Sequence, residues 1–166
     1  MINKFILLAV VGVFMVSCAL QPSTVDEAYN KTKYTVDEYS KAEILEGQYV
    51  TISFGIDGGG GIRLRRVNGN YQLFVTTFSQ LGWCFFERAL DKNAGNLPLN
   101  KARSNVGTGF THEDFYLSIT KAQLEVMGTN GLDVRIYGKN RTINVELPPV
   151  YIQGFMKKAA ELTKGS

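Results

Sequence analysis

Alternation of apolar and polar residues is the strongest structural signal in this chain. From Tyr49, the apolar residues Val50, Ile52, Phe54 and Ile56 recur at every second position. This period places successive side chains on opposite faces of an extended backbone, so it predicts a half-buried β-strand. We also predict strands over residues 62–67, 71–78, 83–89, 115–119, 132–136 and 143–147. The short connections between the first four strands are typical of an antiparallel meander.

Two helices are predicted in the second half of the chain. Thr120 begins a short helix, with Gln123 at capping-box spacing and Gly128 as its C-terminal stop. Pro148 and Pro149 begin a C-terminal helix, because proline is tolerated in a first turn. Its apolar residues recur with helical spacing and form one stripe: Ile152, Phe155, Met156 and Ala159. The sequence therefore predicts the α+β class, with an antiparallel sheet of about six to seven strands and both helices packed on one face.

Two segments have no regular pattern. Residues 91–111 are rich in Asn, Gly and Lys, and we expect a long exposed connection there. Because a structureless loop of that length is unusual, it either hides a short strand at residues 103–106 or has a function. Residues 58–61 are four glycines. They lack the Gly-Lys-Ser/Thr end of a phosphate-binding loop and precede a strand, so we expect a flexible hairpin tip.

The N-terminal segment indicates where the protein is located. Lys4 precedes an apolar run over residues 5–16, and Ser17 and Cys18 follow it. The run is shorter than the roughly 20 apolar residues that a membrane-spanning helix needs, and it has the length of the hydrophobic region of a secretory signal. Residues 15–18, Met-Val-Ser-Cys, resemble the lipobox of bacterial lipoproteins, in which a small residue precedes the cysteine that becomes the lipidated N-terminus.

This resemblance implies that Cys18 carries a thioether-linked diacylglycerol and, in many didermic bacteria, an N-acyl chain such as palmitate. Two or more acyl chains make membrane attachment stable. Ala19 after the cysteine implies an outer-membrane address, facing the periplasm, if the source is didermic. The alternatives are an ordinary cleaved signal, with small residues at Ser17 and Ala19, and a retained anchor helix. Beyond the lipobox, the chain is only loosely similar to small envelope lipoproteins, and that similarity transfers no site residues.

The expected organisation is a signal peptide at residues 1–17, a lipidated N-terminus and tether at residues 18–48, and a single α+β domain at residues 49–166. The tether is polar, with Pro22, Ser23 and Thr24 at its head. Thr35 is a candidate N-cap for a short helix within it, and Ile44 and Leu45 are candidates to meet the core.

Charge and cysteine content narrow the function classes. Without Lys4, 17 of the 18 basic residues remain against 15 acidic ones, and this near-neutral balance argues against a nucleic-acid-binding protein. If Cys18 is lipidated, Cys84 has no partner in its own chain. It either joins two chains or, as we prefer, lies buried in the strand around it as a small apolar residue.

No recognisable catalytic set is present, and we expect no cofactor and no metal. His112 is the only histidine, and no second histidine or free cysteine stands near it. No serine lies in a G-x-S-x-G motif. A carboxylate pair remains open, because spacing does not show which acidic residues converge in space: Glu87, Asp91, Glu113 and Asp114.

Two groups of residues are candidates for binding. Arg63 and Arg65 share a strand face and could meet an anionic sugar, a lipid headgroup or partner carboxylates. The alternative, which we favour, is a solvated face paired with neighbouring acidic residues. Four tyrosines on expected outer or half-buried faces are equally consistent with a recognition surface or a covered sheet: Tyr49, Tyr71, Tyr116 and Tyr137.

The function expected from these features is a lipid-anchored envelope protein, not an enzyme. Its small domain would bind another envelope protein or a cell-wall component, with the membrane contacted through the lipid. One alternative is an inhibitor or immunity lipoprotein that blocks an envelope-targeting enzyme, with a projecting loop at residues 57–61 or 91–111. The second alternative is an envelope hydrolase that uses His112 and nearby carboxylates.

Overall fold

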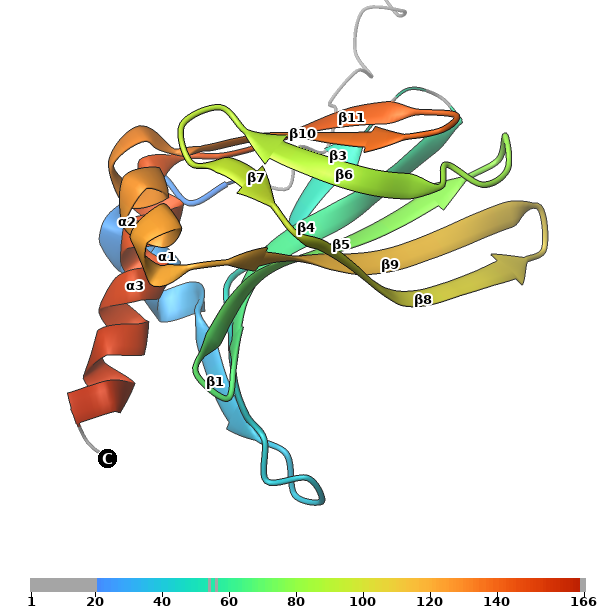
Figure 1. The fold of residues 1–166 in the computed structure, drawn as a ribbon. Helices are drawn as coiled ribbons and strands as arrows, with labels where there is room; N and C mark the ends of the chain where they lie inside the picture. Colours follow the sequence, from blue (N-terminus) through green and yellow to red (C-terminus); the bar gives the residue numbers. More distant parts are fainter. Residues whose placement is uncertain (1–20, 54, 56, 165–166) are drawn as a thin grey trace, which may run out of the picture.

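Two antiparallel β-sheets pack face to face, and three helices lie together at one end of them (Figure 1). The computed structural model describes residues 21–53, 55 and 57–164. The elements in chain order are α1 (Val25–Lys31), β1 (Lys33–Val36), β2 (Glu43–Glu46), β3 (Val50–Ser53), β4 (Gly58–Val67), β5 (Asn70–Ser79), β6 (Phe86–Asp91), β7 (Gly95–Leu97), β8 (Leu99–Gly107), β9 (Phe110–Ile119), α2 (Lys121–Asn130), β10 (Leu132–Gly138), β11 (Thr142–Leu147) and α3 (Pro149–Lys164). The predicted α+β class and antiparallel pairing are confirmed.

The strands divide between two sheets. The seven-stranded sheet has the order β1-β2-β4-β5-β9-β8, and β3 pairs with the first half of β4; the four-stranded sheet has the order β11-β10-β6-β7. The sheets enclose one core, in which the rings of Phe86 and Phe115 lie 5.1 Å apart. The apolar stripe of α3 closes this core, with Ile152, Phe155 and Ala159 buried. The predicted hairpin at residues 132–147 is present as β10 and β11.

The capping box that begins α2 is confirmed. The Thr120 hydroxyl accepts from the Gln123 N–H at 3.2 Å, and the Gln123 side chain accepts from the Thr120 N–H at 3.0 Å. The predicted stop at Gly128 is wrong. Gly128 lies buried inside the helix, and an added Cβ would stand 3.3 Å from the Met156 sulfur. The helix ends instead at Gly131, whose φ of 83° suits glycine.

Most of the segment expected to be a tether is folded onto the domain. Thr24, not Thr35, caps a helix: its hydroxyl accepts from the Glu27 N–H at 3.1 Å, whereas Thr35 lies in β1. α1 packs closely on α3, where an added Cβ at Gly154 would stand 2.5 Å from the Ala28 Cβ. Leu45 joins the core, as expected. The sequence did not predict α1, β1 and β2 because these elements are short and mostly exposed.

The four glycines are not a hairpin tip but the first residues of β4, buried between β3 and β5. An added Cβ at Gly60 would stand 1.9 Å from the carbonyl oxygen of Thr76, and one at Gly61 would stand 1.8 Å from the Tyr49 ring. These glycines therefore allow a close approach of neighbouring groups. Phe54 and Ile56, expected in the preceding strand, lie outside the described residues.

The middle of the chain also differs from the prediction. The fourth strand begins at Phe86, not Trp83, and it enters the second sheet instead of extending the meander. Residues 91–111 are not an exposed loop: they contain β7 and the nine-residue β8, which pairs with β9 along its length. The short strand offered as one alternative at residues 103–106 is present as part of β8. The full length of β8 was not predicted, because it is an edge strand whose residues from Lys101 onward are exposed on both faces.

Candidate functional site

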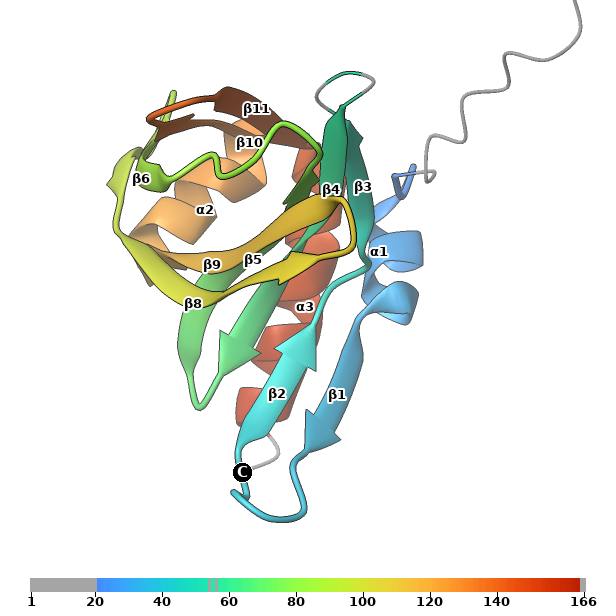
Figure 2. The same ribbon diagram turned by 90° about the vertical axis from the view of Figure 1, so that its right-hand side faces the viewer.

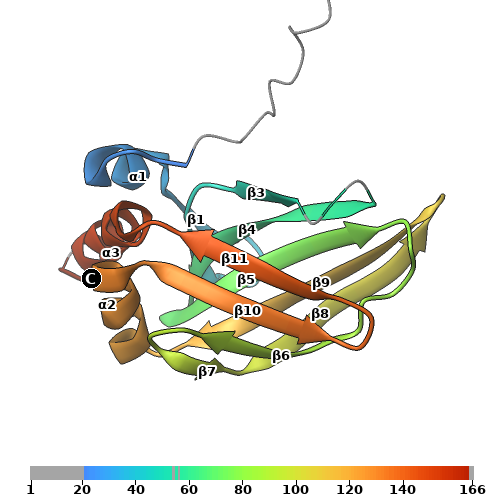
Figure 3. The same ribbon diagram turned by 90° about the horizontal axis from the view of Figure 1, so that it is seen from above.

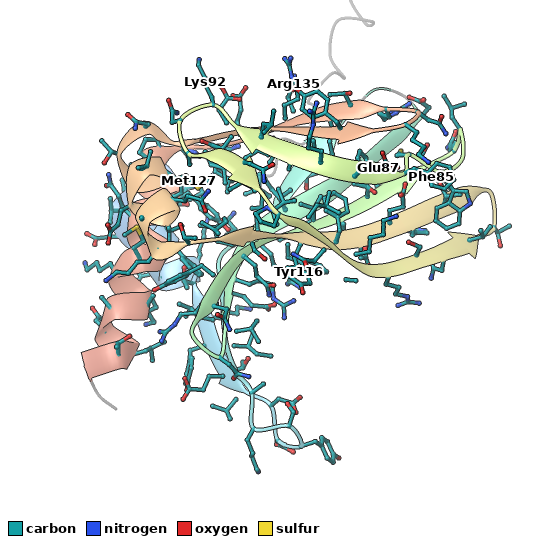
Figure 4. All side chains as sticks on the ribbon, viewed as in Figure 1. Phe85, Glu87, Lys92, Tyr116, Met127 and Arg135 are labelled. Carbon is teal, nitrogen blue, oxygen red and sulfur yellow. The ribbon has the colours of Figure 1, made fainter. Side chains whose placement is uncertain are left out.

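The outer face of the seven-stranded sheet, turned away from the second sheet, carries most of the candidate residues. Across β4, β5, β9 and β8, one register row contains Arg63, Phe74, Tyr116 and Asn100. Figure 4 shows Tyr116 on this side of the molecule, with Arg135 of the second sheet and Lys92 of the β6–β7 turn on the opposite side. These residues are far apart in the sequence. The alternation of apolar and polar residues within each strand therefore did not predict that they are neighbours.

Arg63 and Arg65 lie on this outer face, where the Phe74 ring and the Glu46 carboxylate contact both guanidinium groups. Their guanidinium carbons lie 5.5 and 5.1 Å from the centroid of Phe74. Oε1 of Glu46 lies 3.4 Å from Nη2 of Arg63 and 2.9 Å from Nε of Arg65. One carboxylate thus faces two guanidiniums, so these three side chains sum to +1, and Asp114 lies on the same outer face further along β9. The favoured interpretation, pairing with a neighbouring acid, describes these contacts.

A groove of about 1180 Å³ adjoins these arginines. It runs past the end of the β4–β5 hairpin to the β7–β8 junction and the start of α2. Among the described residues that line it, three are basic and none is acidic: Arg65, Arg66 and Lys121. Acids just outside the lining lie 2.9 Å from Arg65 (Glu46) and 3.9 Å from Lys121 (Glu125). Arg66 donates to the carbonyl of Ala159 at 3.3 Å and to the hydroxyl of Thr163 at 3.4 Å, both neutral acceptors. The groove is therefore electropositive.

Several polar groups in the groove have no internal partner. Within the described part of the chain, the side chains of Gln72, Asn96, Tyr71 and Tyr116 make no hydrogen bond. By contrast, Gln123 is fully engaged, because its amide nitrogen donates to the carbonyls of residues 94 and 96. The unengaged groups are available to a ligand. Sequence reasoning missed Gln72 and Asn96, since isolated amides in a strand and a turn give no distinctive signal.

The four tyrosines do not form one surface. Tyr71 and Tyr116 line the groove. Tyr49 covers Gly61 elsewhere on the outer face, and burial raises the pKa of its hydroxyl. Tyr137 belongs to the second sheet, under the guanidinium of Arg88 at 4.4 Å. Tyr71 points to the core side of β5, where its ring centroid lies 6.4 Å from that of Phe155. Of the four tyrosines, Tyr116 is therefore the one whose side chain belongs to the candidate site.

His112 and the two acids after it point in alternating directions. His112 lies in β9 with its ring 6.5 Å from that of Phe78. Glu113 points to the interior, where its carboxylate accepts the backbone N–H of Cys84 at 2.7 Å and of Phe85 at 3.0 Å. Asp114 returns to the outer face. Glu113 thus has a structural role at the start of β6.

The other two acidic candidates are engaged elsewhere. Glu87 lies 3.4 Å from Lys139 at the surface of the second sheet. Asp91 accepts the backbone N–H groups of residues 93, 94 and 133 at 2.9, 2.7 and 3.0 Å. The described residues contain no group of three or more His, Cys, Asp or Glu side chains arranged to hold a metal ion.

Exposed apolar side chains gather at the end of the sandwich opposite the helices, where Figure 4 shows Phe85. Leu81 and Val106 are 76% and 71% exposed, and the rings of Phe78 and Phe110 lie 6.0 Å apart. Phe85 has a φ of 54°, in the left-handed region that disfavours aromatic residues. The sequence did not predict this surface, because a strand was expected over residues 83–89, which include Phe85.

The two cysteines have separate surroundings. Cys84 is buried and unpaired, and burial raises the pKa of its thiol. The preferred reading, a small apolar core residue, is confirmed. Cys18 and the rest of the lipobox-like sequence lie outside the described residues. The described chain begins at Gln21, which donates to the carbonyl of Glu146 at 3.4 Å, and Pro22 next to it is buried.

The geometry defines an α+β domain with an electropositive groove on one sheet. No protein-family model, curated protein sequence or solved structure matches the chain. Among the helices of the described residues, none has the length and apolar character needed to cross a membrane.

Proposed function

We propose that this protein is a lipid-anchored envelope protein whose domain binds an envelope component in the groove beside Arg65. The observation that carries the proposal is the groove itself: a large concave surface with three basic residues, no acidic lining residue and several unengaged polar groups. Ligand sites are typically concave surfaces with a few convergent polar groups. The lipobox-like sequence at residues 15–18 supports the anchor.

The start of the fold supports a specific placement of the domain. Only Ala19 and Leu20 separate Cys18 from Gln21. Three residue steps span at most about 10 Å, so an anchor at Cys18 would hold the domain against the bilayer instead of lifting it on a tether. Figures 2 and 3 show α1 and β8 on opposite sides of the molecule. With the α1 side next to the bilayer, the groove would open toward another envelope protein or the cell wall.

The anchor is tested by mass spectrometry of the processed chain. We expect an N-terminal Cys18 that carries a diacylglyceryl thioether, and loss of membrane attachment in Cys18→Ser. Cys84→Ser is the matched control, because it removes the other thiol and should leave attachment intact. An unmodified N-terminus at another residue would refute the anchor.

The binding face is tested by site-specific photo-crosslinking in intact cells. A photo-reactive residue at Gln72 should capture an envelope component, whereas one at Arg135, on the exposed face of the second sheet, should not. Equal capture from both positions would contradict a binding role for the groove.

A projecting hairpin favours a second candidate, the inhibitor function. β8 and the start of β9 extend beyond the second sheet (Figures 1 and 3), and Val106 near the tip is 71% exposed. An inhibitor of an enzyme cleft needs such a protruding element. Co-purification of one enzyme in stoichiometric amount, lost in Val106→Asp and kept in Gln72→Ala, would favour this candidate over the groove.

A further inference from the structure

The charge of the groove selects an anionic ligand. Arg63 and Arg65 share the carboxylate of Glu46, so this group keeps one positive charge. Arg66, the next residue along β4, points to the α3 side of the sheet and meets only the neutral acceptors of Ala159 and Thr163 in its hydrogen bonds. It adds positive charge at the edge of the groove, but its guanidinium does not lie beside that of Arg65. A guanidinium held in place loses little side-chain freedom when an oxyanion binds, which favours bidentate recognition of a carboxylate.

The neutral groups of the groove select a ligand rich in hydroxyl groups. Gln72 and Asn96 each present both a donor and an acceptor through an unengaged carboxamide. The hydroxyl of Tyr116 adds a further group of the same dual character. A sugar hydroxyl is itself a donor and an acceptor, so a row of such groups matches a pyranose ring. The half-buried ring of Tyr116 offers an apolar surface for its C–H face.

The same groove is a poor match for a protein segment. Protein interfaces depend on a few apolar or aromatic anchors that are fully desolvated at their centre. In the groove, the Phe74 ring is already covered by the guanidiniums of Arg63 and Arg65. The exposed aliphatic side chains of Leu81 and Val106 lie at the other end of the molecule, away from the groove.

We propose that the groove lined by Arg65, Gln72, Asn96 and Tyr116 binds a carboxylate-bearing oligosaccharide. The Arg65 guanidinium takes the carboxylate, and the carboxamides of Gln72 and Asn96 and the Tyr116 hydroxyl take the ring hydroxyls. This assignment rests on the proposed binding role of the groove and is independent of the lipid anchor.

The test is calorimetric titration of the full chain, purified in detergent, with a short oligogalacturonide. We expect saturable binding, and at least about tenfold weaker binding of the neutral galactose oligomer, since the charged hydrogen bonds are lost. Arg65→Gln and Gln72→Ala should each weaken oligogalacturonide binding by about tenfold. Arg135→Gln is the matched control: Arg135 is likewise an arginine on the outer face of a strand, but on the second sheet, where its Nε donates to the side-chain oxygen of Asn144 at 3.0 Å.

Other outcomes would overturn the assignment. Equal affinity for the neutral oligomer would remove the role of the arginines, and displacement by inorganic phosphate at matched concentration would indicate a simple anion site. Equal affinity for an oligoglutamate peptide would indicate a protein partner. If Arg65→Gln lowers the unfolding temperature, its weaker binding does not report on the ligand contact alone. The affinity of Gln72→Ala then decides the test. If a photo-reactive residue at Gln72 captures an envelope component in cells but the purified chain does not bind oligogalacturonide, only the ligand class is refuted. If both experiments fail, the binding role of the groove is refuted.

Discussion

Removing the buried carboxylate of Glu113 should destabilise the fold strongly. Glu113 is 9% exposed, and it accepts two backbone N–H groups at the start of β6, from Cys84 at 2.7 Å and Phe85 at 3.0 Å. A hydrogen bond to a charged group contributes about 1.5–3 kcal/mol. Glu113→Ala leaves both donors without this acceptor, so we expect a loss of about 3 kcal/mol at least. For a chain of this size, that loss lowers the midpoint of thermal unfolding by about 6–12 °C.

Two variants separate this effect from the general effect of losing a surface charge. Glu113→Gln keeps one acceptor oxygen and should lose about half as much stability as Glu113→Ala. Glu87→Ala removes an exposed carboxylate that pairs with Lys139 at 3.4 Å, and it should change stability by less than about 1 kcal/mol.

The assay is urea unfolding followed by circular dichroism and by the fluorescence of Trp83, the single tryptophan. Hydrogen exchange should also show faster exchange of the amides of residues 84 and 85 in Glu113→Ala than in Glu87→Ala. If Glu113→Ala unfolds within about 0.5 kcal/mol of the unchanged protein, the structural role assigned to this carboxylate is wrong.

Three further predictions concern packing, acid stability and thiol reactivity. Gly154→Ala should destabilise the fold by about 1–3 kcal/mol in urea unfolding, although alanine favours helices, because its Cβ would stand 2.5 Å from that of Ala28; a gain in stability would contradict this close contact. The hydrogen bond from Arg141 lowers the pKa of the Asp57 carboxyl from 3.8, so it stabilises the fold above about pH 4 and less as the pH falls through the folded-state pKa. Asp57→Asn should therefore be destabilising at neutral pH, and a stability loss unchanged at about pH 2 would refute this linkage. Burial raises the pKa of the Cys84 thiol, so thiol reagents should modify it much faster in urea than in buffer, as mapped by mass spectrometry; equal rates would show an accessible thiol.

Local signals in the sequence predicted the parts of the fold that depend on local structure. The capping box at Thr120 and the alternation around Val134 and Val145 need no knowledge of distant contacts, and both predictions are confirmed. The T-V-D-E sequence shows where prediction from local sequence fails. It occurs at residues 24–27 and 35–38, but the first copy begins a helix because Ala28 packs against α3, whereas the second lies at the end of an exposed strand.

The candidate site was harder to predict than the fold class. Alternation placed Arg63 and Arg65 on one face, and the structure agrees. The other walls of the groove come from β5, β9 and the β7–β8 junction, which only the pairing register brings together. The glycines at residues 58–61 suggested flexibility, because the sequence does not reveal that the Tyr49 ring and the Thr76 backbone occupy the space of a side chain.

The close packing of α1 on α3 determines how the molecule would respond to a pulling force. For a chain held at its N-terminal end, tension reaches α1 before it reaches either sheet. α1 is held on α3 by Ala28 against Gly154 and by surface contacts of Asp26 with Lys157 and of Tyr29 with Glu161, and it belongs to neither sheet, so it would detach while both sheets stay intact. The roughly 12 residues from Gln21 to Thr32 would then extend by up to about 40 Å, and a domain seated on its anchoring surface would gain reach without unfolding.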